Sequence, residues 1–165
     1  MSDRNTAART EYDDPYLFDV GPIVLAHAGT PVSDRPLSYV RQAIRGEIDA
    51  VVPYTALLGT HLILSRYYGF TAESASRVMR RFMRARRIDW VGTLSRTTVE
   101  SSFDRAAALN VQSWDGYYAE IAVSKDVNTI LTIDKGDFDG LEGVDVELAL
   151  TDDEFDELNE YLDVR

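Results

Sequence analysis

The residues of this sequence best suited to chemistry are three aspartates, each at the end of an apolar run or at the start of a helix. Asp19 and Asp134 follow strand-like runs at residues 16–18 and 128–133, and Asp115 stands at a predicted helix start. In an open parallel sheet, strand ends and helix starts meet at one edge, where ligands bind. Carboxylates gathered there supply hard oxygen donors suited to Mg²⁺ or Mn²⁺. The sequence therefore predicts a divalent-cation site made of these three aspartates.

The elements that position these aspartates follow from apolar periodicity, capping residues and breakers. Strands are predicted over residues 16–19, 48–52, 88–91, 128–133 and 144–150. Helices are predicted between them and after the last strand, with Ser33, Thr71, Thr97, Ser113 and Thr151 as N-terminal caps. Strands that alternate with helices indicate an α/β domain with about five mainly parallel strands and helices on both faces, a three-layer arrangement.

Three segments are expected along the chain. Residues 1–14 are polar and aperiodic, which predicts a flexible N-terminal tail. Residues 15–150 carry the alternating strands and helices of a single domain. Residues 151–165 form an acidic amphipathic helix, and its apolar face predicts that it packs on the domain or is appended to it.

Composition narrows the class of protein. The chain has 165 residues, no cysteine, and 28 acidic against 17 basic residues, for a net charge of −11. This charge argues against a broad nucleic-acid-binding coat, and the lack of cysteine excludes disulfides and thiolate metal sites. Only two of the basic residues are lysine, a composition that resembles proteins from salt-loving organisms. No signal peptide or membrane-length apolar run is present, so we expect a cytoplasmic protein without a membrane partner.

Arginines gather on one face of the helix predicted over residues 72–87. At about 100° per residue, five of them fall within an arc of roughly 120°, and they are Arg77, Arg80, Arg81, Arg84 and Arg87. A positive stripe in so acidic a protein could guide RNA phosphates toward the aspartates, or could bind an acidic partner protein. An ordinary solvated helix face is the simpler interpretation.

The ordered set of motifs resembles the PIN-domain family, specifically the VapC-type toxins. The matching pieces are the strand ending in Asp19, a long helix after Pro53, the Trp114-Asp115 helix start and the run Leu131-Thr132-Ile133-Asp134 with Asp137-Phe138. The resemblance implies a metal-dependent endoribonuclease that uses Mg²⁺ or Mn²⁺. It also implies that Asp19, Asp115 and Asp134 are catalytic metal ligands, with Asp137 a further ligand near the rim. An antitoxin protein and a second copy of the chain are the implied partners.

Two positions depart from the family pattern. The family usually has an asparagine two residues after the first aspartate, where this chain has Gly21, and a glutamate on the helix after the second strand, where it has Gly59. His61 should face away from this position and Thr55 is neutral, so neither replaces the lost acid. The departures predict reduced activity, or alternatively a catalytically silent PIN-like fold that serves as a binding or dimerisation module.

Simpler interpretations stand beside these. Asp19 could be a polar strand end, Asp115 a carboxylate that stabilises a helix N-terminus, and Asp134 and Asp137 turn residues. Trp114 is expected to be a packing residue. As a set, the aspartates favour the cation site. A phosphoacceptor domain of the receiver type, which also clusters aspartates at strand ends, is a third reading.

Overall fold

The computed structural model describes residues 15–134 and 136–163, and its centre is one five-stranded sheet. All strand pairs are parallel and the spatial order is β3-β2-β1-β4-β5. The strands are β1 Tyr16–Phe18, β2 Ala50–Pro53, β3 Ile88–Val91, β4 Thr129–Thr132 and β5 Asp145–Leu148. The tail predicted over residues 1–14 lies outside the described residues.

The strand order reverses between β1 and β4. The chain builds β1, β2 and β3 outward on one side, then returns to add β4 and β5 on the other. Such a reversal leaves a crevice at the carboxyl ends of the two central strands, here just before Asp19 and Asp134. Receiver domains have the order 2-1-3-4-5 instead, so the phosphoacceptor interpretation was wrong.

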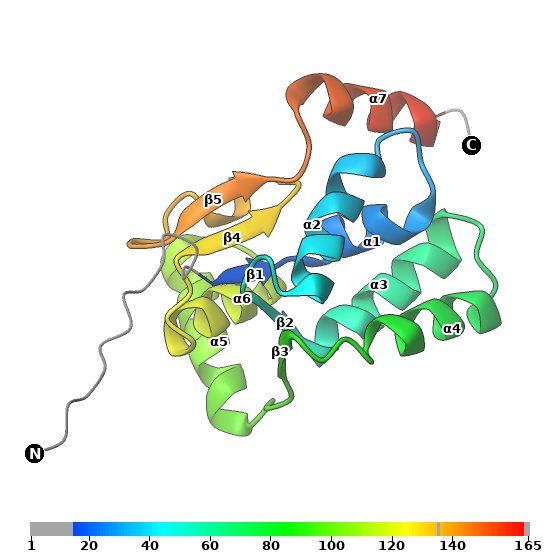
Figure 1. Ribbon diagram of the computed structural model, residues 1–165. Coiled ribbons are helices and arrows are strands. Elements are labelled where there is room, and N and C mark those ends of the chain that lie inside the picture. The colour runs from blue at the N-terminus through cyan, green and yellow to red at the C-terminus, as the bar shows by residue number, and fades with distance from the viewer. Residues whose placement is uncertain (1–14, 135, 164–165) are drawn as a thin grey trace, which may run out of the picture.

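Helices cover both faces of the sheet. In Figure 1, α2 lies in front of the sheet, α5 and α6 lie behind it, and α1, α3 and α4 gather on the side toward which the strands point. The helices are α1 Val20–Ala28, α2 Asp34–Arg45, α3 Tyr54–Tyr67, α4 Ala72–Phe82, α5 Arg96–Leu109, α6 Ser113–Ser124 and α7 Asp152–Asp163, with a 3₁₀ turn η1 at Gly136–Phe138.

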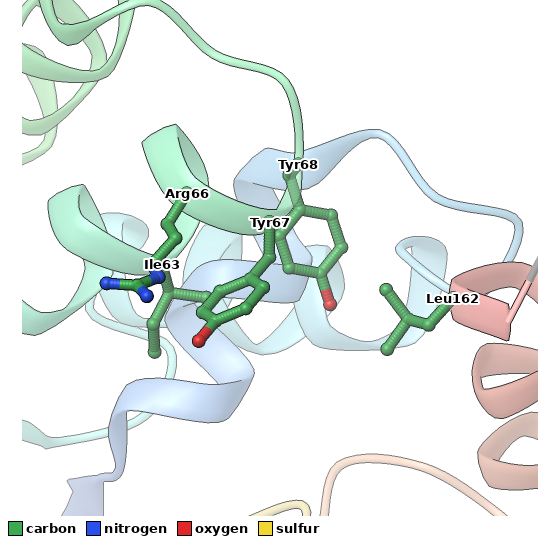
Figure 2. Close-up of a pocket in the computed structure, with 5 residues that line it drawn as sticks. All are labelled: Ile63, Arg66, Tyr67, Tyr68 and Leu162. Carbon is green, nitrogen blue, oxygen red and sulfur yellow. The ribbon is translucent and has the colours of Figure 1, made fainter. Parts of the chain in front are cut away.

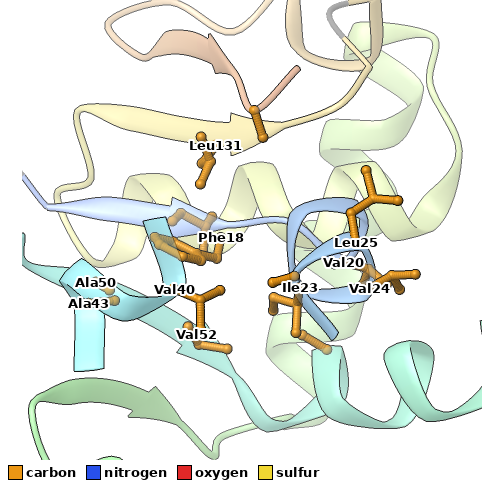
Figure 3. Close-up of a cluster of buried hydrophobic side chains, with 14 of the residues drawn as sticks. Phe18, Val20, Ile23, Val24, Leu25, Val40, Ala43, Ala50, Val52 and Leu131 are labelled. Carbon is orange, nitrogen blue, oxygen red and sulfur yellow. The ribbon is translucent and has the colours of Figure 1, made fainter. Parts of the chain in front are cut away.

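The core forms where the central strands meet α1 and α2. Phe18, Val52 and Leu131 have no solvent exposure, and Ile23 of α1 and Val40 of α2 pack against this layer (Figure 3). Strands buried on both faces explain the continuous apolar runs in the sequence, since parallel sheets are covered by helices on each side. This rigid layer holds the strand ends that carry the aspartates.

Two of the predicted helix caps were wrong. The cap of α5 is Ser95, whose hydroxyl accepts from the amide of Thr98, and the prediction of Thr97 was two residues late. The residue that caps α6 is Gln112, and Ser113 is already inside the helix. Several Ser, Thr and Gln residues lie within three positions of each start, and tertiary packing chooses among them.

The cap predicted at Ser33 stands at the right position but does not use its side chain on the helix. Ser33 precedes α2, yet its hydroxyl accepts from the backbone amide of Thr30 in the preceding turn. The caps Thr71 and Thr151 are confirmed, the latter with Glu154 in a reciprocal capping box.

Helix α4 ends at Phe82, five residues before the predicted end at Arg87. The backbone tightens there, because the amide of Ala85 bonds to the carbonyl of Phe82. The indole N–H of Trp90 donates a hydrogen bond to the carbonyl of Ala85. A side chain from β3 thereby supplies the bond that a further helical turn would have made.

The C-terminal helix α7 packs on the domain through a few apolar side chains. Leu158 is buried in the core and Tyr161 is partly buried against it. Leu162 faces the end of α3 across a cavity of about 470 Å³, with Tyr67 and Tyr68 on the opposite wall (Figure 2). No helix within the described part of the chain is both long and apolar enough to cross a membrane.

Candidate carboxylate site

Asp19 is built into the junction between β1 and α1. It caps α1, and its Oδ1 accepts the amide of Val20 at 2.7 Å. Its Oδ2 accepts the hydroxyl of Thr132 from the neighbouring strand at 2.7 Å. Burial raises the pKa of Asp19 above its ordinary value of 3.8, and these two hydrogen bonds oppose that rise. The side chain is therefore held in one orientation at the crevice.

Thr132 joins the two central strand ends and was not predicted as a site residue. Its side chain is fully buried, and its hydroxyl, which donates to Asp19, also accepts the amide of Asp134 at 3.1 Å. Asp134 in turn accepts the amide of Gly136 through Oδ1, a turn geometry typical of aspartate. One signal in the sequence was its position, two residues before Asp134 at a strand end.

Asp115 lies in the first turn of α6, behind the sheet. Its carboxylate accepts a backbone hydrogen bond from Gln112, as expected of an acid at a helix N-terminus. Despite this bond its pKa is raised from the ordinary 3.8 to about 6, first by burial and then by the charges of Asp137, Asp19 and Asp134. The helix start explains where the residue sits, and its neighbours explain why its charge is disfavoured.

A cavity of about 760 Å³ opens between α6 and the turn after β4. We call it the carboxylate pocket, and it is lined by Asn110, Val111, Gln112, Trp114, Asp115, Asp134, Gly136 and Asp137. Burial, and then the charge of Asp134, raise the pKa of Asp137 as well. Asp19 does not line the cavity, but its charge raises the pKa of Asp115. The four predicted aspartates thus form one repulsive cluster, the kind of arrangement that marks functional sites.

The fit of this cluster to a metal ion is partial. The donors are the hard oxygens that Mg²⁺ and Mn²⁺ prefer, and a cation would offset the repulsion among them. However, within residues 15–134 and 136–163 no three Asp, Glu or His side chains stand close enough to hold one ion together. The arrangement therefore offers the right chemistry without a finished three-ligand set.

Comparison with solved structures connects this architecture to known proteins. PAE2754 from Pyrobaculum aerophilum matches 92% of this chain and 97% of its own, at 15% identity and a TM-score of 0.57. Mycobacterium tuberculosis VapC20, described as a toxin that cleaves the sarcin-ricin loop, matches 79% of this chain and 98% of its own, at 12% identity and a TM-score of 0.61. A Klebsiella pneumoniae toxin–antitoxin complex matches 82% and 98%, at 14% identity and 0.58.

The chain has a PIN-like fold. The five-stranded parallel sheet with helices on both faces, predicted from the sequence, is confirmed. At sequence identities of 12–15%, the likeness to these structures shows the fold and nothing finer. No protein-family model matches the chain, and no curated protein matches it either.

Gly59 lies where a glutamate was expected from the family pattern, and two side chains stand against it. A Cβ at this position would lie 3.3 Å from Cγ2 of Val20 and 3.7 Å from Cζ2 of Trp114. Thr55, one turn earlier, bonds to the hydroxyl of Tyr117, whereas His61 contacts Ala72 and Ser76 of α4. As predicted, His61 faces away and cannot replace the missing acid.

Gly21 is required by its neighbour in this PIN-like fold. A Cβ here would lie 2.7 Å from Cγ1 of Ile133, closer than real side chains approach. The first turn of α1 therefore packs directly on the residue that follows β4. An asparagine in place of Gly21 would therefore need Ile133 to move.

Tyr118 is a further site residue that the sequence did not indicate. It is fully buried, and its hydroxyl lacks a hydrogen-bond partner among the described residues. Burial, and then the charge of Asp19, raise its pKa well above the ordinary value, so the phenol stays protonated. The indole of Trp114 approaches it and offsets a little of this rise. An unused buried donor thus lies near the buried carboxylate of Asp19.

The arginines occupy a different surface from the aspartates. A hollow of about 700 Å³ on α4 and the turn that follows it is lined by Glu73, Ser76, Arg77, Arg80, Arg81 and Arg84. The prediction of one continuous helical face was wrong, because Arg84 and Arg87 lie beyond the end of α4. The side chain of Arg87 instead packs across Gly46, at the end of α2. None of these arginines lines the carboxylate pocket.

Proposed function

We propose that this chain is a VapC-type endoribonuclease that cleaves RNA phosphodiester bonds with Mg²⁺ or Mn²⁺, at reduced activity. The observation that carries the proposal is the cluster of four aspartates, in which burial, and then the charges of Asp137, Asp19 and Asp134, raise the pKa of Asp115 to about 6. Such a cluster lowers stability at neutral pH unless a cation offsets its charge. The likeness in fold to VapC20, described as a toxin that cleaves the sarcin-ricin loop, supports the same substrate class.

In this proposal Asp19, Asp115 and Asp134 hold the ion, and Asp137 contributes from the rim. A bound divalent ion supplies Lewis acidity to a phosphodiester and an activated water. Thr132 keeps Asp19 in its orientation through the 2.7 Å hydrogen bond to Oδ2. Reduced activity follows from the missing acid at Gly59 and from the absence of a finished three-ligand set in the described residues.

An antitoxin protein is the proposed partner, and a second copy of the chain is a further one. A structure similar in fold, from Klebsiella pneumoniae, is described as a toxin–antitoxin complex. The arginines of α4 and its following turn line a hollow beside Glu73, with which Arg77 is paired, and they supply charge for an acidic partner segment or for RNA phosphates. Because the hollow lies outside the carboxylate pocket, RNA would have to span both surfaces to use them together.

The test is cleavage of single-stranded RNA with Mn²⁺ by the wild type, Asp19→Asn and Asp139→Asn. The assay belongs in molar potassium chloride, given the acidic and lysine-poor composition. We expect Asp19→Asn to lower the rate by more than about 100-fold, since losing a residue that only hydrogen-bonds to a metal ligand already costs about 10–100-fold. Asp139 does not line the pocket, so its variant should cleave like the wild type. Equal rates for all three would refute the assignment.

A catalytically silent PIN-like fold is the second candidate, and the packing at Gly21 favours it. Ile133 fills the space beside Gly21 that an asparagine would need. Melting temperature with and without Mn²⁺ separates the two, because a ligand bound only by the native state must raise it. A clear rise that Asp19→Asn abolishes supports the nuclease, whereas no rise and no cleavage supports the silent module.

A further inference from the structure

Trp114 presents a large aromatic surface to solvent inside the carboxylate pocket. Its side chain is 42% exposed and lines the pocket together with Asp115, Asp134 and Asp137. Leaving an indole exposed forfeits the free energy of burying it, about 25 cal/mol per Å² of apolar surface. The ring is therefore placed where a ligand entering the pocket would meet it.

Neighbouring side chains hold this ring in place without covering it. Tyr117 and Tyr118 pack against it at 6.1 and 6.3 Å between ring centroids, both tilted by more than 50°. Gly59 of α3 also neighbours the indole, since a Cβ at this position would lie 3.7 Å from Cζ2. Because residue 59 is glycine, it places no side chain over the ring.

Trp90, the other tryptophan of the chain, has the contacts expected of a packing residue. Trp90 stacks on Tyr54 at 5.3 Å with an interplanar angle of 8°, and meets Phe82 edge-on at 5.4 Å. Its indole N–H donates to the carbonyl of Ala85 at 2.9 Å. Both its face and its polar atom are used within the fold. Trp114 makes only tilted aromatic contacts, its indole N–H approaches the hydroxyl of Tyr118, and 42% of the residue remains exposed.

We infer that Trp114 is a stacking platform for an unpaired nucleobase of RNA bound in the carboxylate pocket. This inference rests on the proposed function and names its substrate as single-stranded RNA. Every base has a π-face that can stack on an indole, whereas bases inside a duplex have both faces covered. Because Trp114 directly precedes Asp115, a base stacked on it would bring the adjoining phosphate close to the carboxylates. The prediction from the sequence that Trp114 is a packing residue is revised accordingly.

The experiment is equilibrium binding of a labelled single-stranded RNA decamer, followed by fluorescence anisotropy in EDTA so that no cleavage occurs. The variants are Trp114→Leu, which keeps apolar packing but has no aromatic face, and Trp114→Phe, which keeps a smaller one. Phe155→Ala is the matched control, because Phe155 of α7 is 40% exposed and lies outside the pocket. Circular dichroism melting verifies that each variant is folded.

We expect Trp114→Leu to weaken binding by about five- to 150-fold, the range that removal of one stacked base contact produces. Trp114→Phe should recover most of that loss, and Phe155→Ala should bind like the wild type. In a Trp90→Phe background, where Trp114 is the single tryptophan, RNA should also quench the remaining emission. Equal affinity of Trp114→Leu and the wild type overturns the platform and leaves the nuclease proposal standing. Failure of the wild type to bind the RNA also overturns the platform, and the cleavage assay with Mn²⁺ then decides the nuclease proposal separately.

Discussion

The two sides of the aspartate cluster differ in how completely they are built. On the strand side, Asp19, Thr132 and Asp134 are joined by hydrogen bonds that run from α1 through both central strands. On the side of α3, Gly59 offers no side chain, and Val20 and Trp114 stand where an acid would reach. The strand side is therefore fixed by hydrogen bonds within the sheet, whereas residue 59 of α3 contributes no polar group.

The packing at Gly21 gives the largest expected effect on the strand side. Gly21→Asn, the family residue, should lower the free energy of unfolding by about 3 kcal/mol, because its Cβ would meet the stiff branched side chain of Ile133 at 2.7 Å. Gly92→Asn is the matched control, since its Cβ would find only ordinary contact with Tyr54 at 3.5 Å. Urea denaturation of both variants measures the difference. A Gly21→Asn variant as stable as the wild type would mean that Ile133 moves freely.

Removing the hydroxyl of Thr132 has the next largest expected effect on the free energy of unfolding. Thr132→Val keeps the shape but removes the donor to Asp19, which should cost about 2 kcal/mol because the acceptor is a buried carboxylate. Thr60→Val is a close control, since Thr60 is also fully buried but its hydroxyl has no hydrogen-bond partner among the described residues. That variant should be neutral or slightly more stable. Equal losses for the two valines would show that the Thr132–Asp19 bond contributes nothing special.

Much of the strand side could be predicted from the sequence, and the helix side could not. Apolar runs that end in aspartate indicated which strands meet at the crevice, and β3 was predicted with its observed bounds, Ile88–Val91. The contacts at Gly21 and Gly59 depend on Ile133 and Trp114, which are more than 50 residues away along the chain. Local propensity carries no information about such pairs. The role of the aspartates as metal ligands stays a prediction.

Helix ends show the same limit. The early end of α4 is accompanied by a hydrogen bond from a different element, because the indole N–H of Trp90 in β3 donates to the carbonyl of Ala85. The caps of α5 and α6 depend on which of several adjacent polar residues the packing of these two helices favours. Gly116 makes that packing possible, because a Cβ there would lie 2.3 Å from the carbonyl oxygen of Ser102. The element types were predictable, and the bounds that shape the pocket were set by tertiary contacts.

Removing the charge of Asp115 has the smallest expected effect on the free energy of unfolding, and this change should stabilise the protein. Its pKa of about 6 in the folded state, above the ordinary 3.8, means that the native state loses stability as pH rises through this interval. Asp115→Asn should therefore match the wild type below about pH 4 and be more stable by about 1 kcal/mol at pH 7.5. The full shift of about two pKa units would give nearly 3 kcal/mol, but Asp115 is only half-buried and solvent screens its charge. Thermal melts at both pH values measure the gain, with Asp104→Asn on the exposed face of α5 as the control.

Mn²⁺ should reduce or reverse this gain at pH 7.5, because an ion bound by the wild type offsets the repulsion that the asparagine removes. A variant less stable than the wild type at pH 7.5 without metal would show instead that the hydrogen bond to Gln112 outweighs the repulsion, so that Asp115 serves the helix and not the pocket.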